Sequence, residues 1–334
     1  MSFRDVPVSV LDRANALAGV DQTDVLRGVI DRARRVEGLG FKRFWVAEHH
    51  GVPGIVGATP TVLMAAIAAE TQKIRIGSGG VMLPNHAPLI VAEQAATLEA
   101  LHPGRIDLGL GRSVGFTPAV REALRSERGA ALRFGEDLRE LMAFLNGTAP
   151  FTARPRNDAA TPLFVLATGQ GLVTAAELGL AVVVGGPSVV HREGDSHPGL
   201  AAYRRDFQPS PWWPEPYVIV SADVAVADSA DDAERLVLPE AWSLAQSSTR
   251  GEFSPLESAD EVAAKVARAP DRERTRTQEH LDAAVAGTPD EVAAGVQELL
   301  SYTGADEVLI TGGMSDIAGQ QRSDELAAEI FGQG

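Results

Sequence analysis

The feature that most limits the possible folds of this chain is a regular alternation of short apolar segments with helical segments. We expect strands at residues 6–11, 41–47, 74–77, 106–110, 163–166, 181–184, 217–226 and 306–310. Apolar and polar residues scarcely alternate within them, which is typical of strands buried on both faces of a parallel sheet. Eight such strands, separated by helices, predict a (β/α)8 TIM barrel.

The intervening segments carry helical spacing and helix boundary signals. Residues 23–39 place apolar residues three and four positions apart, and Gly38 and Gly40 end the pattern. Pro60 stands in the first turn of the next expected helix, where proline is favoured. Further helices are expected at residues 89–101, 134–145, 171–178 and 199–207, with a closing helix that reaches Phe331.

A doubly wound sheet is the alternative arrangement of such units. Dinucleotide-binding sheets of that kind need G-x-G-x-x-G at the first strand-to-helix turn. Here no glycine occurs between Leu11 and Gly19, and the glycines at 109, 111 and 115 have a different spacing. We therefore expect one barrel domain over residues 1–334, with an insertion after the seventh strand at approximately residues 228–287.

Composition and charge argue against several classes of function. The chain has 334 residues and a formal net charge of −15, which disfavours binding to nucleic acid or to an anionic membrane surface. It has no cysteine, so a disulfide framework and a cysteine nucleophile are excluded. The sequence shows no secretory signal and no apolar stretch long enough to span a bilayer. We expect a cytoplasmic protein.

The expected strand at residues 41–47 ends in three ionisable residues, Glu48, His49 and His50. Ligands of α/β folds bind at the carboxyl ends of parallel strands. Ionisable groups at the end of a buried strand are costly unless something uses them. His49 and His50 are therefore candidate catalytic residues. The alternative is that both are surface histidines or hydrogen-bonded core residues.

Other strand ends are rich in glycine, which lets a flat ligand approach the backbone closely. Gly79 and Gly80 follow the third strand. Arg112 follows a glycine turn after the fourth strand, where it can bind a phosphate or carboxylate or pair with an acidic neighbour such as Asp107.

A further candidate anion site follows the fifth strand. Thr168, Gly169 and Gln170 stand where a helix is expected to begin, and a helix N-terminus with a hydroxyl group favours anions. The alternative is that Thr168 is an ordinary helix N-cap. Together with Arg112, this segment predicts a phosphorylated ligand.

Two other features leave less to conclude. Adjacent residues on a strand point to opposite sides, so His49 and His50 are poorly placed to bind one metal ion, and we expect no metal. Trp212 and Trp213 lie between prolines. They either line a substrate entrance or pack against a neighbouring element.

Several motifs, taken in their order, resemble those of the bacterial luciferase-like flavin monooxygenases. They are Trp45-Val-Ala-Glu-His-His50, Ile74-Arg-Ile-Gly-Ser-Gly-Gly-Val-Met-Leu-Pro-Asn-His86, Glu93-Gln94 and Leu101-His-Pro-Gly-Arg-Ile-Asp-Leu-Gly-Leu-Gly-Arg112. The resemblance covers most of the chain and is densest from residue 40 to residue 113. The fold that it implies is the same (β/α)8 barrel.

The resemblance implies an FMN-dependent monooxygenase. Reduced FMN, supplied by a separate flavin reductase, would react with O2 to a C4a-hydroperoxyflavin that transfers one oxygen atom to a small or medium apolar organic substrate. His49 would act at the flavin, with His50 as the second candidate. The residues implied to bind the flavin are Gly79, Gly80, Arg112, Ala167, Thr168, Gly169 and Gln170. The glycine pair is often joined by a non-proline cis peptide in this family, and a homodimer is also implied.

The sequence departs from the family pattern in the phosphate-binding loop. Many relatives carry a Ser-Ser-Gly-Tyr-like loop where this chain has Ala167-Thr-Gly-Gln170, so one hydroxyl and one aromatic ring are missing. Two alternatives therefore stay open. One is an F420-dependent oxidoreductase of the same barrel superfamily, which transfers hydride, and the other is a non-catalytic flavin-binding protein.

Overall fold

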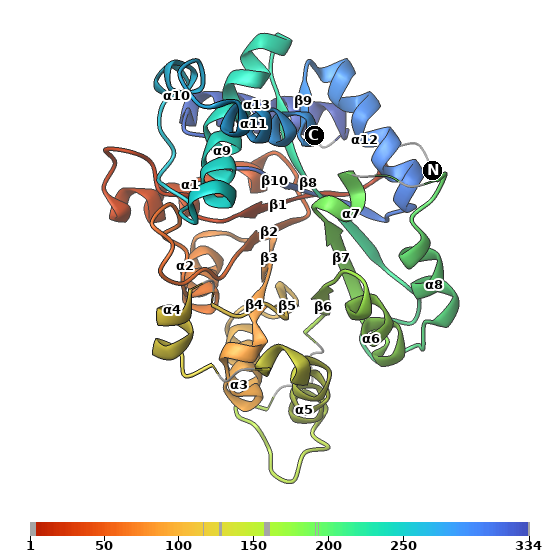
Figure 1. The fold of residues 1–334 in the computed structure, drawn as a ribbon. Coiled ribbons are helices and arrows are strands. Elements are labelled where there is room, and N and C mark those ends of the chain that lie inside the picture. The colour runs from red at the N-terminus through yellow and green to blue at the C-terminus, as the bar shows by residue number, and fades with distance from the viewer. Residues whose placement is uncertain are drawn as a thin grey trace.

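The computed structural model describes residues 5–115, 117–126, 129–156, 161–190, 192 and 194–332. Its centre is a closed barrel of parallel strands (Figure 1). In chain order these are β1 (Val8–Asp12), β2 (Arg43–Val46), β3 (Arg75–Ser78), β5 (Ile106–Gly111), β6 (Leu163–Leu166), β7 (Ala181–Gly185), β8 (Val218–Val226) and β10 (Glu307–Thr311). Each pairs with the next, and β10 pairs with both β8 and β1, which closes the barrel. The expected TIM barrel is confirmed.

Helices cover the outside of the barrel (Figure 1). They are α1 (Gln22–Gly38), α2 (Pro60–Glu70), α3 (Pro88–Leu101), α4 (Pro118–Ala123), α5 (Phe134–Asn146), α6 (Gln170–Leu178), α7 (Pro187–Val190), α8 (Pro198–Asp206), α12 (Pro289–Thr303) and α13 (Ile317–Ile330). The apolar residues that predicted α1 from their spacing are mostly buried against the barrel. The Asp21 side chain caps the first turn of this helix by accepting a hydrogen bond from the Thr23 amide. No helix in the described ranges is both long and apolar enough to cross a bilayer.

The two-residue period of the strands sorts side chains between the barrel interior and the helical layer. On β2, Trp45 points into the barrel, while Phe44 and Val46 pack in the core beneath the helices. Ala47 continues the inward series of Trp45. His49 stands two residues further, so the same period places it on the inner side at the carboxyl end of the strand.

The expected insertion after the seventh strand is largely helical. Residues 228–287 contain α9 (Ala230–Arg250), α10 (Ala259–Val266) and α11 (Asp271–Ala283), followed by β9 (Val285–Gly287). In Figure 1 these three helices gather on one side of the barrel, near α13. Apolar periodicity did not predict α11 because this charged helix buries only Glu273 and Thr277.

Candidate active site at the carboxyl end of the barrel

A cavity of about 450 Å³ opens at the carboxyl ends of the barrel strands. Most residues expected from the sequence line it, namely His49, Gly79, Gly80, Arg112, Ala167 and Thr168. His50, Gly169 and Gln170 do not belong to its lining. The sequence therefore predicted a set of residues that the fold does bring around one cavity.

Beside the cavity, the parallel neighbours β3 and β5 and the segments at their ends approach each other closely. The expected cis peptide bond joins Gly79 and Gly80. A Cβ on Gly80 would lie 2.8 Å from the carbonyl oxygen of Gly109, and a Cβ on Gly109 would overlap the carbonyl oxygen of Ser78. These glycines are thus required by strand packing, which is a different reason from the ligand approach inferred from the sequence.

One part of the cavity wall is suited to an anion. The helix α6 begins beside it, and no side chain caps its first turn, so Thr168 is not the ordinary N-cap considered from the sequence. Amide groups at such a helix start favour a negative charge. Arg112 is exposed on the same cavity, and the described residues provide it with no hydrogen bond or ion pair. Asp107 is not its partner, because Arg43 and Arg75 bind that carboxylate.

His49 contributes an imidazole ring to the lining of this cavity. Removal of the ring from water lowers the pKa of His49 to about 4, and the positive charge of Arg13 acts in the same direction. The imidazole is therefore neutral at pH 7 and able to accept a proton. Arg13 itself is held by Glu240 of α9, with 2.5 Å between Nη2 and Oε1.

Glu48 also lines the cavity, whereas His50 lies outside its lining. The carboxylate of Glu48 is buried. Its Oε1 lies 2.8 Å from His50 Nε2 and 2.9 Å from His86 Nε2. The Met82 amide donates to its Oε2 over 3.0 Å. His50 thus contacts Glu48 and does not line the cavity, so His49 is the better placed of the two histidines expected from the sequence.

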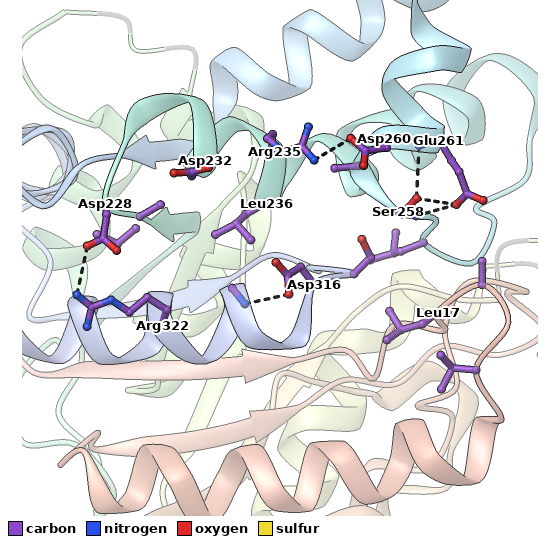
Figure 2. A pocket seen from close by; sticks show the side chains of 18 residues that line it. Leu17, Asp228, Asp232, Arg235, Leu236, Ser258, Asp260, Glu261, Asp316 and Arg322 are labelled. Carbon is purple, nitrogen blue, oxygen red and sulfur yellow. Dashed lines mark hydrogen bonds and ion pairs between the residues drawn. The ribbon is translucent and has the colours of Figure 1, made fainter.

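A second cavity, of about 550 Å³, lies between α9, α10 and α13 (Figure 2). Its arginines are already paired, Arg322 with Asp228 at 3.2 Å and Arg235 with Asp260 at 2.8 Å. Ser258 and Asp316 accept hydrogen bonds from the first turns of α10 and α13. Its polar groups therefore serve the local structure. Among the described residues, no cluster of histidine and acidic side chains is arranged to hold a metal ion.

Comparison with known proteins identifies the family to which the chain belongs. The family model for luciferase-like monooxygenases matches residues 7–307. A luciferase-like monooxygenase of Escherichia coli (strain K12) is 33% identical over 341 residues, which span 99% of this chain and 98% of that relative. The chain belongs to the luciferase-like monooxygenase family. The crystal structure of apo-MsnO8 has a TM-score of 0.88 and 31% identity, and the match covers 98% of this chain and 99% of that one.

More distant luciferase-like barrels share the fold alone. One is the oxygenating constituent of 3,6-diketocamphane monooxygenase from Pseudomonas putida in complex with FMN, with a TM-score of 0.73, 18% identity and 97% coverage of each chain. Another is an F420-dependent secondary alcohol dehydrogenase, with a TM-score of 0.67, 15% identity and 98% coverage of each chain. The fold therefore occurs with both cofactors.

Sequence reasoning missed several residues of this luciferase-like barrel. Phe134 of α5, Ser221 of β8 and Met82 also line the cavity, and they reach it only because the barrel closes. His86 was part of a quoted motif, but its contact with Glu48 spans 38 positions and leaves no local pattern. Trp213 does not line the cavity. Its Nε1 donates a hydrogen bond to the carbonyl oxygen of Leu163, at the amino end of β6 and therefore at the opposite end of the barrel.

Proposed function

We propose that the protein is a flavin-dependent monooxygenase that uses reduced FMN and O2 to oxygenate a small or medium apolar organic substrate. The observation that carries this proposal is one cavity that combines a helix start without a side-chain cap, an arginine that pairs with none of the described residues, and a neutral histidine. A flavin carries a phosphate and performs the redox chemistry, so both kinds of group are needed. Membership of the luciferase-like monooxygenase family supports the same reaction class.

Different residues of the cavity would bind the phosphate and the ring of FMN. Arg112 and the amides at the start of α6 would hold the phosphate, and Thr168 would add a hydroxyl. Gly79 and Gly80 line the cavity without side chains and would lie against the flavin ring. Bound reduced FMN supplies the two electrons that activate O2. We further propose that a separate reductase delivers it.

The remaining walls suit an apolar substrate. Leu11, Met82, Phe134, Val183 and Leu309 line the cavity and limit the access of water. His49 is the group that can accept or return a proton beside the reacting atoms.

The test of this function is the reaction of protein-bound reduced FMN with O2. We expect the protein to bind reduced FMN under anaerobic conditions and to delay its reoxidation, relative to FMN free in solution, when O2 is mixed in. Binding of F420 in place of FMN would favour the F420-dependent oxidoreductase. Binding of FMN with no change in its reoxidation would favour the non-catalytic flavin-binding protein.

Arg112→Ala tests the phosphate assignment. The change removes a charge-assisted hydrogen bond and should weaken FMN binding by roughly 1.5–3 kcal/mol, about ten- to a hundredfold in Kd. The matched control is Arg139→Ala, because Arg139 is an exposed arginine of α5 that does not line the cavity. Equal FMN affinity in Arg112→Ala and the wild type would show that the phosphate binds elsewhere.

A further inference from the structure

The buried carboxylate of Glu48 is neutralised in an unusual way for this protein. Several other buried carboxylates are paired with arginine, as Asp107 is with Arg43 and Asp324 is with Arg32. Among the described residues, the side chains that contact the Glu48 carboxylate are two imidazoles, those of His50 and His86. Arginine keeps its charge at all physiological pH values, whereas imidazole gains and loses a proton near neutrality.

The three groups connect the cavity with the surface of the protein. Glu48 lines the cavity, and its side chain is fully buried. The side chains of His50 and His86 are 20% and 30% exposed, so each reaches solvent. A chain of groups that can carry protons therefore runs from the cavity wall to the surface.

We propose that Glu48, His50 and His86 form a proton relay between solvent and the reaction cavity. This rests on the proposed function, because the reaction consumes a proton from solvent whenever reduced FMN enters as its anion. In the uncoupled reaction, anionic reduced FMN, O2 and one proton give oxidised FMN and hydrogen peroxide. Atoms, charge and the two transferred electrons balance in that equation.

The relay moves one proton in each cycle. An imidazole takes a proton from solvent and passes its Nε2 proton to Oε1 of Glu48. The carboxylic acid gives the proton to the acceptor in the cavity and returns to the carboxylate. The charged and titratable groups that face the relay are His49, between Glu48 and His50 in the chain, and Arg13, which acts on His49.

The relay can first be tested without a cofactor. Nitrogen-15 NMR of the histidine rings in the ligand-free protein should show that Nε2 of both His50 and His86 is hydrogen-bonded to the carboxylate of Glu48. The isosteric change Glu48→Gln should change the Nε2 signals of both rings, because the shared carboxylate is gone. Nε2 signals that Glu48→Gln leaves unchanged would overturn the proposal. This result does not depend on whether FMN binds.

The second test uses FMN and O2. His86→Ala and Glu48→Gln should bind FMN within twofold of the wild type but oxidise bound reduced FMN about ten- to a hundredfold more slowly, in the range of a lost proton-transfer group. Added imidazole should restore the rate of His86→Ala, which a purely structural role does not predict. His102→Ala is the matched control, since His102 is half-buried at the end of α3 and distant in sequence from the relay.

The outcomes separate the relay from the proposed function. Unchanged oxidation rates and pH profiles in both variants, with FMN bound, would refute the relay and leave the monooxygenase proposal standing. A wild type that binds no FMN would refute the monooxygenase proposal, and the NMR comparison of the wild type with Glu48→Gln would then decide the relay by itself. Slow oxidation without imidazole rescue in His86→Ala would show a structural role and also refute the relay.

Discussion

The protonation of His49 links the stability of the protein to the chemistry of its cavity. Its pKa is about 4 in the folded chain, mainly because the ring is withdrawn from water and secondarily because Arg13 is near. In the unfolded chain the ordinary pKa is about 6.5. Between these values the unfolded state binds more protons, so the free energy of unfolding rises with pH from 4 to 6.5. The burial that keeps the His49 ring neutral for the proposed chemistry thus lowers the free energy of unfolding at acidic pH.

His49→Gln should remove this pH dependence. In the wild type, His49 should lower the free energy of unfolding by about 2 kcal/mol between pH 7 and pH 5, as its two pKa values require. Urea unfolding at the two pH values measures the difference in both proteins. The lowered pKa of Glu48 acts in a separate window, because its stabilisation is lost only as pH falls below about 4.5. An unchanged pH dependence in His49→Gln would show that other groups cause it.

Among the elements, strands were easier to predict than the contacts between them. The strand expected at residues 163–166 is observed as β6 (Leu163–Leu166), because a short, doubly buried strand has a local apolar signal. The helix α11 lacks such a signal. The sequence predicted that glycines at the strand ends surround the site. It did not predict their role in packing, because that role depends on how closely β3 and β5 approach each other, and no local sequence pattern indicates that distance.

Two glycines of β5 provide a matched test of this packing. A Cβ at position 109 would overlap the backbone of Ser78, whereas at position 111 its nearest neighbour would be 3.9 Å away. Gly109→Ala should therefore destabilise the protein by roughly 1–3 kcal/mol or more, the cost of overpacking a core. Gly111→Ala should change the stability by less than about 0.5 kcal/mol. Thermal and urea unfolding measure both. Equal effects would mean that the close approach of β3 and β5 relaxes easily.

For the whole molecule, a buried ionic network at the amino end of the barrel joins strands that are distant in sequence. Asp107 of β5 binds Arg43 of β2 and Arg75 of β3, each at 2.6 Å. Glu307 of β10 binds Arg43 at 2.9 Å and accepts a hydrogen bond from Ser9 of β1 at 2.5 Å. The network lies at the end opposite the cavity, with Trp45 between them. The barrel thus separates a structural end from a chemical end.

Removing Asp107 tests this separation. Asp107→Ala leaves the buried Arg43 with one carboxylate fewer and should lower the free energy of unfolding by roughly 3–5 kcal/mol, as for other broken buried ion pairs. The control Glu279→Ala breaks the exposed pair with Arg276 and should cost less than about 1 kcal/mol. The folded Asp107→Ala protein should bind FMN as tightly as the wild type, because no group of the network lines the cavity. A loss of FMN affinity at a temperature where the variant is folded would show that the two ends of the barrel are coupled. A loss of stability no larger than that of the control would show that the network is dispensable for folding.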